Sequence, residues 1–530
     1  MNKLLTIFIF TLSVSSYGQS GEWTWMNGDS AQIPNANYGT QGVFDSLNTP
    51  PALYEACEWT DLQGNFWLFG GANNYSDLWK FNPSINQWSW IKGPGIINQW
   101  GIYGTKGIPS PNNNPGARSW GCATWTDLNN NLWLFGGIAY DVNGNANEMN
   151  DLWKYNISTN EWTWMNGADT IHSSGVYGIK GISSPANTPP CMWENNGSWT
   201  DSNNSLWLFG GKSYAHQNAS LNTLWKYNIS TNQWTWVNGI DSGYAQAIYG
   251  IKGIASPLNN PGSRTVYSKW KDSNDNLWFF GGGYDAHQKN DLWKYNISTD
   301  EWTWISGDSA TIGNVGLDTI CNQSINNIPG GRYENRACWI RECDNLALYG
   351  GFGASGRLGD LWNYKISTDE WSLISGDIII NTSAVFGTKG ISSPANKPNA
   401  SAGSIGWKDI AGNLWLFGGT GGGNTLWRYI SDTTCQNPCS LTSIMELNDM
   451  KNFISFFPNP FHSVCTLETL MEFDNAELRI FNILGVLVRK ETLFKQTIYK
   501  VHRNELTAGI YLFQLITDNG NIAISKVVIE

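Results

Sequence analysis

Few side chains in this 530-residue sequence have the types and spacing of a known catalytic site. The G-x-S-x-G, H-E-x-x-H and P-loop patterns are missing, and no Cys or His cluster has zinc-site spacing. His216 in SYAHQ and His287 in YDAHQ stand in similar segments, close to Tyr214 and Tyr284. Imidazole can ligate a metal, but duplication of one segment explains the pattern equally well. We therefore expect no metal, no cofactor and no catalytic residue.

A second chemical candidate is an arginine that recurs near a Pro-Gly pair. Arg118 follows PGA, Arg264 follows PGS and Arg332 follows PGG. A guanidinium group binds carboxylates and other anions through paired hydrogen bonds. Because the same residue returns at widely separated points, its role depends on the elements that carry it.

Those elements repeat along the chain. The segment DLWKYNISTNEWTWMNG at 151–167 returns with small changes from residues 77, 223, 291 and 360, and half of it, TLWRYI, starts at 425. An apolar run ending in two glycines recurs beside it, and its second glycine stands at 71, 137, 211, 282, 351 and 419. Spacings of 66 to 74 residues therefore define six repeats within 21–430.

Each repeat contains four predicted strands with apolar residues at consecutive positions, as expected for sheets that are covered on both faces. Several such four-stranded sheets describe a β-propeller. The sixth repeat supplies only three strands, whereas GEWTWMNG at 21–28 is a strand without a repeat of its own. We expect this N-terminal strand to complete the sixth sheet and close the ring.

The apolar run ending in Gly-Gly, followed by Tyr155 and by Trp162 seven residues later, resembles the kelch motif. The resemblance covers about three-quarters of the chain, although the repeats are about 70 residues long against the usual ~50. It implies that Arg118, Arg264 and Arg332 line the mouth of a central channel.

Kelch propellers also include a copper radical oxidase resembling galactose oxidase and some sugar-acid epimerases. Copper oxidase chemistry needs two His, two Tyr and a Cys bonded to one Tyr, converging on the propeller axis. Of the five histidines, His462 and His502 lie outside the repeats. The resemblance therefore favours a binding protein, with a carbohydrate-active propeller enzyme as the alternative.

The tryptophans fall into two groups. Of the 31, all but three stand at fixed positions of the repeat, which predicts packing between sheets. Trp100, Trp120 and Trp193 lie outside these positions, so they are better candidates for ligand contact.

Long insertions fall between strands two and three and between successive repeats, which places them on one face of a propeller. The connections between repeats share an aromatic-Gly-x-Lys-Gly pattern, which we interpret as a packing framework. The fifth repeat has WIREC in place of the WTD type and lacks the second-strand Trp. Its irregularity offers a place for a ligand, although drift explains it equally well.

Charge and the N-terminus narrow the possible functions. A net charge of −11 and a pI near 5.0 give little support to nucleic-acid binding. Residues 1–18 combine an early Lys, a short apolar run and small residues before Gln19, which predicts a cleavable signal peptide. The run is shorter than the ~20 residues of a membrane span, and no later segment is long enough.

The last part of the chain differs in composition, since tryptophan is absent after residue 430. A polar linker leads to a predicted small antiparallel sandwich. Its segments PNP at 458–460, FN at 481–482, GIY at 509–511 and KVVI at 526–529 resemble the type A C-terminal sorting domain of the type IX secretion system of Bacteroidetes. The resemblance implies export across the outer membrane, with surface attachment or release.

We therefore predict an all-β protein with a signal peptide (1–18), a six-bladed kelch-type propeller (21–430), a linker (431–452) and a sorting domain (453–530). It would be secreted or attached to the outer-membrane surface, without a transmembrane segment in the mature chain, and would bind an unknown protein or glycan, not nucleic acid. The type IX machinery would be its partner in export. The candidate ligand-binding residues are Arg118, Arg264, Arg332, Trp100, Trp120, Trp193, His216 and His287.

Overall fold

The computed structural model describes residues 21–30, 35–71, 73–141, 143–265, 267–284, 287–309, 315–317, 323–376, 378–421, 423–431, 454–469, 474–482, 487–495, 497–517 and 522–530. The predicted signal peptide and nearly all of the predicted linker lie outside these ranges. The chain divides into two compact units, Met1–Gln436 and Asn437–Glu530, which we describe separately. Within the described ranges, no helix has the length and apolar character needed to cross a membrane.

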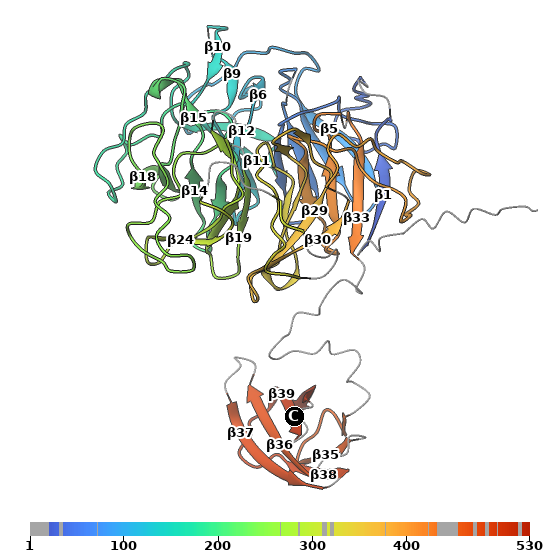
Figure 1. Ribbon diagram of the computed structural model, residues 1–530. Helices are drawn as coiled ribbons and strands as arrows, with labels where there is room; N and C mark the ends of the chain where they lie inside the picture. Colours follow the sequence, from blue (N-terminus) through green and yellow to red (C-terminus); the bar gives the residue numbers. More distant parts are fainter. Residues whose placement is uncertain are drawn as a thin grey trace, which may run out of the picture. The chain divides into compact units, whose positions relative to one another are not determined.

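Six antiparallel sheets of four strands build the first unit, and we number them as blades along the chain (Figure 1). Blades one to three consist of β2 (Cys57–Thr60), β3 (Phe66–Phe69), β4 (Leu78–Asn82) and β5 (Gln87–Lys92); β7 (Ala123–Thr126), β8 (Asn131–Phe135), β11 (Leu152–Asn156) and β12 (Glu161–Asn166); and β13 (Ser198–Thr200), β14 (Ser205–Phe209), β17 (Leu224–Asn228) and β18 (Gln233–Asn238).

Blades four to six follow the same plan. They consist of β19 (Ser268–Lys271), β20 (Leu277–Phe280), β23 (Leu292–Asn296) and β24 (Glu301–Ser306); β25 (Cys338–Ile340), β26 (Leu346–Tyr349), β29 (Leu361–Lys365) and β30 (Glu370–Ser375); and β31 (Ile405–Lys408), β32 (Leu414–Phe417), β33 (Leu426–Ser431) and β1 (Gly21–Asn27).

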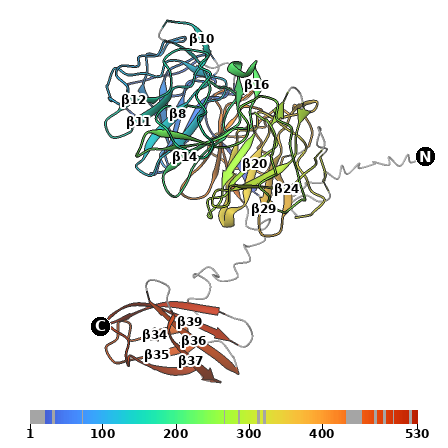
Figure 2. The same ribbon diagram turned by 90° about the vertical axis from the view of Figure 1, so that its left-hand side faces the viewer.

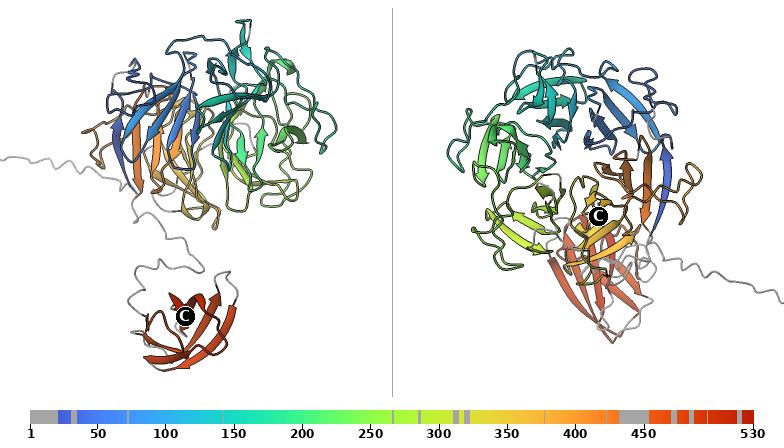
Figure 3. Two further views of the ribbon diagram at one scale, coloured as in Figure 1. Left: turned by 180° about the vertical axis from the view of Figure 1, so that it is seen from behind. Right: turned by 45° about the horizontal axis from the view of Figure 1, so that its top comes forward.

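The first strands of the blades surround a common axis. β2 contacts β7, and the contacts continue through β13, β19, β25 and β31, which contacts β2 again. Figure 3 shows the resulting ring of blades in its right-hand view. The predicted propeller is therefore confirmed, and the first strand of each blade is its inner strand.

The N-terminal strand closes the ring. β1 pairs with β33 in antiparallel register, with Gly21 opposite Ser431 and Trp23 opposite Tyr429. Trp23 is 1% exposed and packs against Tyr429, with ring centroids 5.1 Å apart. The half-copy of the repeat is thus completed by the opposite end of the propeller sequence, as predicted.

The tryptophans at fixed repeat positions pack inside the propeller. In the second strands, β3 and β14 are buried at every residue, which accounts for their consecutive apolar residues. Trp67 contacts Tyr155 of the next blade, and Phe69 contacts Trp162. Repetition of these contacts links the blades through aromatic rings.

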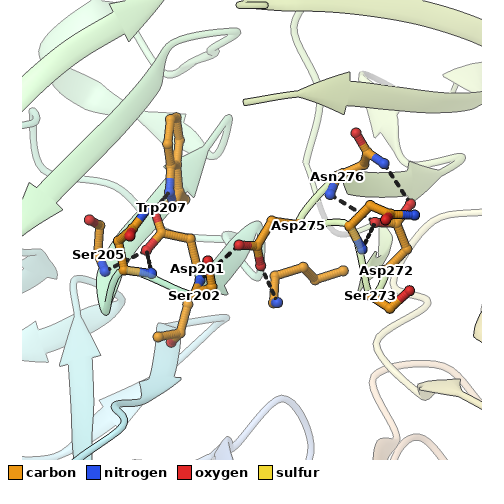
Figure 4. Close-up of polar contacts among 12 residues, drawn as sticks. Asp201, Ser202, Ser205, Trp207, Asp272, Ser273, Asp275 and Asn276 are labelled. Atoms are coloured by element: carbon orange, nitrogen blue, oxygen red, sulfur yellow. Dashed lines mark hydrogen bonds and ion pairs between the residues drawn. The ribbon is translucent and has the colours of Figure 1, made fainter. Parts of the chain in front are cut away.

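The short turns between the first two strands carry a recurring aspartate. Asp201 accepts hydrogen bonds from the Ser205 N–H and the Trp207 Nε1–H, both at 2.8 Å (Figure 4). Ser202 in the same turn donates its N–H to Asp275 of blade four at 2.9 Å, which links neighbouring turns. The same Asp–Trp contact occurs at Asp61, Asp127, Asp272 and Asp409.

Blade five departs from this arrangement in two coupled positions. Arg341 replaces the aspartate, and Ala347 replaces the tryptophan whose N–H the aspartate would accept. Arg341 instead donates to Asn363 Oδ1 at 3.0 Å. Loss of the donor and of its acceptor in the same blade leaves neither group unpaired.

The long connections contain small additional elements. One of them is the β9–β10 hairpin, which projects from the propeller in Figure 1. These elements are β6 (Arg118–Ser119), β9 (Ile138–Tyr140), β10 (Ala146–Glu148), β15 (Lys212–Ser213), η1 (Tyr214–His216), β16 (Ala219–Ser220), β21 (Gly283–Tyr284), β22 (His287–Gln288), β27 (Phe352–Gly353) and β28 (Gly356–Arg357). The short turn between β25 and β26 holds η2 (Glu342–Asp344).

The second unit is a two-sheet sandwich (Figure 2). Its sheets contain β34 (Ile454–Phe457), β35 (Val464–Thr469) and β38 (Ile498–His502), and β37 (Leu487–Phe494), β36 (Asn475–Asn482), β39 (Gly509–Thr517) and β40 (Ile522–Ile529). Phe456, Leu478 and Phe513 belong to its core. Asn459 of the PNP segment donates to Lys526 O at 2.9 Å and accepts the Val528 N–H at 2.8 Å, so it ties the first segment to the last strand.

Candidate functional site

The three predicted arginines lie in the protein interior, each at most 1% exposed. Each Nη1 donates to the Oδ1 of the aspartate that precedes the third strand of its blade, at 2.8–3.0 Å. The pairs are Arg118 with Asp151, Arg264 with Asp291 and Arg332 with Asp360. Burial alone would raise the pKa of Asp291, but Arg264 holds that pKa below its ordinary value.

The repeats themselves show why these arginines are present. Blades three and six have Thr223 and Thr425 at the aspartate position, and neither blade has the Pro-Gly arginine. Arginine and aspartate occur together in blades two, four and five, as members of a buried ion pair need to, whereas Asp77 of blade one has no arginine and accepts hydrogen bonds from the Tyr38 hydroxyl and the Gly95 N–H. This burial corrects the expectation that the three guanidinium groups are open to a ligand.

The loops between blades form the packing framework that their repeated sequence predicts. Lys106 Nζ lies 4.2 Å from the Trp164 ring centroid and donates to Gly167 O at 2.7 Å. Equivalent cation–π contacts are made by Lys180 with Trp236, Lys252 with Trp304 and Lys389 with Trp25. These lysine side chains are therefore engaged in cation–π contacts within the propeller.

Two of the three unassigned tryptophans meet. The Trp120 and Trp193 rings are in edge contact, with centroids 6.3 Å apart, and Tyr54 lies 5.9 Å from Trp120 on another side. Trp120 is 43% exposed and Trp193 is half-buried. Trp100, at 59% exposed, lies instead against Gly144 in the loop of the β9–β10 hairpin.

The structure describes the side chain of only one histidine of the predicted pair. His216 lies in η1, with Nε2 3.2 Å from Asp241 O and its ring 6.0 Å from Tyr177. Burial lowers the pKa of His216. His287 starts β22, but its side chain lies outside the described atoms. Among the described residues, no three His, Cys, Asp or Glu side chains are placed to share a metal ion.

A ring of strained residues precedes the inner strands. Glu55, Trp120, Glu194 and Glu334 have φ angles of +48° to +57°, a region that disfavours side chains with a Cβ. The strained backbone lets neighbouring blades hydrogen-bond around the axis. Glu194 N–H donates to Trp120 O at 2.8 Å, and Gly403 links Glu334 to Glu55 in the same way.

We call the group formed by Tyr54, Glu55, Trp120, Trp193, Glu194 and Glu334 the channel mouth. Its three glutamates come from three different blades and interact electrostatically with one another. Burial, together with the Glu194 charge, raises the pKa of Glu334 to about 7, against the opposing effect of a hydrogen bond from the Tyr54 hydroxyl. The mouth therefore combines acidic groups with aromatic rings.

Polar side chains also link the inner strands of different blades. Arg336, just before β25, donates to Glu58 Oε2 of β2 at 2.9 Å. Blade six stands between these two blades in the ring, and its residue equivalent to Glu58 is Gly406. Lys269 donates to Ser198, and burial lowers the pKa of Lys269 to about 8. The inner strands thus enclose a polar network.

The sequence contained a signal for the acidic part of the mouth. A glutamate stands four or five residues before the inner-strand tryptophan in three repeats: Glu55, Glu194 and Glu334. Only a closed ring brings these three positions together, so the spacing within a single repeat does not show that they meet.

Blade five also has a cavity, of about 240 Å³, where its sequence is irregular. Val315, Leu358 and Ile380 line it, and the Arg332–Asp360 pair contributes to its wall. Because this ion pair is already satisfied, the cavity presents mainly apolar surface. The channel mouth, by contrast, presents both rings and charges.

Comparison with known proteins agrees with the fold. Residues 97–314 match the KLHDC2/KLHL20/DRC7 kelch-repeats domain. A kelch repeat-containing protein of Dictyostelium discoideum is 22% identical over 280 residues, and the leucine-zipper-like transcriptional regulator 1 homolog of Drosophila melanogaster is 22% identical over 387 residues. The matches cover 51% and 61% of this chain and 34% of each relative, so the chain spans about a third of their length. The solved structure of YjhT is similar at 14% identity and a TM-score of 0.45, over 72% of this chain and 95% of YjhT.

Residues 455–530 match the secretion system C-terminal sorting domain. This match includes all of the second unit from β35 onward and shows that the chain is addressed to the type IX system, for delivery to the cell surface or release. The chain therefore combines a propeller that contains a matching kelch-repeats domain with a C-terminal sorting domain for type IX export.

Proposed function

We propose that this protein is a non-enzymatic binding protein, which recognises a protein or a glycan at the channel mouth on its long-loop face. One observation carries the proposal. Trp120 and Trp193, which serve no repeated packing position, come from successive inter-blade loops and contact each other at the mouth. Exposed aromatic rings beside polar groups on a rigid frame are a common form of binding site.

The test compares two exposed tryptophans on the full mature chain. Glycan arrays and panels of purified extracellular proteins would be screened with the wild type, Trp120→Ala and Trp100→Ala. We expect Trp120→Ala to weaken binding of the identified ligand at least tenfold, since central aromatic contacts dominate interfaces. We expect Trp100→Ala to bind normally. Equal binding by Trp120→Ala and the wild type would exclude the mouth as the site.

The alternative is a propeller enzyme that acts on carbohydrate. A copper oxidase of this kind would retain copper after dialysis and produce hydrogen peroxide from a sugar alcohol. An epimerase would interconvert sugar-acid isomers without copper. Retained stoichiometric copper, peroxide formation or epimerisation by the purified chain would replace the binding proposal.

A further inference from the structure

Glu55 has the least satisfied carboxyl group of the channel mouth. Its side chain is 1% exposed, and both carboxylate oxygens lack a hydrogen-bond partner among the described residues. Its backbone N–H donates to Gly403 O at 3.1 Å, which ties this position into the ring of backbone contacts. A buried carboxylate without a partner is strongly unfavourable, which makes this position a place prepared for a missing group.

The charges that face Glu55 are mainly negative. Glu194 and Glu334 both interact with it unfavourably, and the Cys122 thiol adds to this effect. Arg336 acts on it as a cation; its Nη2 is paired with Glu58 at 2.9 Å, while its Nε and Nη1 have no hydrogen-bond partner among the described residues. The mouth therefore has more acidic than basic groups, and an additional positive charge would be favourable there.

Aromatic rings complete the acidic group. The Tyr54 ring contacts Trp120, and Trp120 contacts Trp193. Lys212 Nζ already lies 5.2 Å from the Trp193 centroid, which shows that one of these rings accepts a cation. Aromatic faces together with carboxylates favour organic cations, whose alkyl part packs on the rings while the charge meets the acid. A metal ion would use only the oxygens.

We propose that the channel mouth binds an organic cation, a primary ammonium or a guanidinium group, that pairs with Glu55 and packs on Trp120. This proposal rests on the proposed binding function and names the chemistry of the ligand. The cation belongs either to a free amine or to a lysine or arginine side chain of a partner protein.

The experiment titrates butylammonium and butylguanidinium into the full mature chain at pH 8 by calorimetry, with 1-pentanol as the uncharged probe and Ca²⁺ as the metal probe. We expect one or both cations to bind and the alcohol to bind at least tenfold more weakly. Glu55→Gln removes the charge with little change of shape, and should weaken cation binding at least tenfold. Glu370→Gln on β30, outside the mouth, is the matched control and should bind normally.

Two further measurements keep the outcome independent of the folding of one variant. Glu194→Gln should also weaken cation binding, by a smaller factor. For the wild type, the affinity for the cation should fall from pH 8 to pH 5, because the mouth carboxylates take up protons over this range. The other titratable side chains around them are Tyr54, Cys122, Arg336 and Lys212. Binding of Ca²⁺ in preference to both organic cations would contradict the proposal, as would cation binding that is unchanged in both glutamate variants.

The source of the cation is found with the peptide Ac-Gly-Lys-Gly-amide and its norleucine analogue. Binding of the lysine peptide alone indicates a partner protein, whereas binding of butylammonium without the peptide indicates a free amine. If neither cation binds the wild type while a Trp120-dependent ligand emerges from the arrays, the cation proposal is wrong and the binding function stands. If the array ligand is insensitive to Trp120→Ala, the binding function itself fails.

Discussion

The two ends of the inner strands are built in opposite ways. At the short-turn end, five blades place an aspartate whose carboxylate accepts backbone N–H groups and a tryptophan N–H, as Asp201 does from Ser205 and Trp207. At the channel mouth, strained glutamates from three blades face one another, and Glu55 has no hydrogen-bond partner among the described residues. One end repeats a satisfied polar network, and the other breaks the repeat and leaves charge unsatisfied.

This difference separates structural from functional residues in a repeat protein. A group that recurs in each blade with its partner, such as the Asp–Trp pair, stabilises the blade and needs no ligand. An unpaired buried charge lowers stability, so it persists where it has another use. Repetition alone draws attention to Arg264 and its equivalents, which are buried and paired within their blades.

Deletion of β1, residues 21–27, should have the largest effect because both ends depend on a closed ring. It would expose the edge of β33 and remove the buried Trp23, at a cost of at least about 5 kcal/mol of unfolding free energy. Tryptophan fluorescence during urea unfolding measures the propeller alone, since no tryptophan follows residue 430. An unchanged midpoint would show that the ring closes without this strand.

Arg264→Met tests whether the buried pairs near the mouth act like the short-turn network. Removal of the guanidinium leaves the Asp291 carboxylate buried without its cation, so we expect a loss of about 3–5 kcal/mol. The double variant with Asp291→Thr, which copies blade three, should recover part of the loss. If the Arg264→Met protein were as stable as the wild type but no longer bound the ligand, Arg264 would be a ligand-binding residue.

Asp201→Ala should cost about 2–3 kcal/mol, because the Trp207 Nε1–H and the turn N–H groups lose their acceptor. The same urea titration measures this loss. Asp201→Asn is the sharper control, since it keeps one acceptor oxygen and should be less destabilising. An effect below about 0.5 kcal/mol for the alanine variant would show that water replaces the carboxylate.

Glu55→Gln should have the smallest effect on the free energy of unfolding, and it should stabilise the protein, whereas the three preceding changes destabilise it. Burial, opposed by Arg336 and reinforced by Glu334 and Glu194, raises the pKa of Glu55 well above its ordinary value of 4.5. The folded wild type therefore loses stability as the pH rises above 4.5, when only the unfolded chain readily gives up the proton. The variant should gain about 1–2 kcal/mol at pH 8 and little at pH 4. Destabilisation at pH 8 would mean that the carboxylate has a partner inside the fold.

Sequence reasoning predicted the architecture because packing is repeated in this protein. Aligning the repeats gives their period and shows that the sixth blade is built from both ends of the propeller sequence. It also separates the tryptophans at repeated packing positions from the others, which include Trp120 and Trp193. The acidic mouth was missed because each glutamate is unremarkable within its own repeat. Positive φ angles and long-range electrostatics arise only when blades far apart in sequence meet.

The pairing of β1 with β33 also has a kinetic consequence. Gly21 and Ser431 are joined across nearly the whole propeller sequence, so their contact is among the most non-local in the chain. Closing such a long loop has a high entropic cost, and we expect ring closure to be one of the last steps of folding. Until then β33 keeps an unpaired edge in the last blade, and β1 has no strand beside it. During export, the ring of a partly translocated chain would therefore remain open, because β1 cannot pair until β33 has also crossed the membrane.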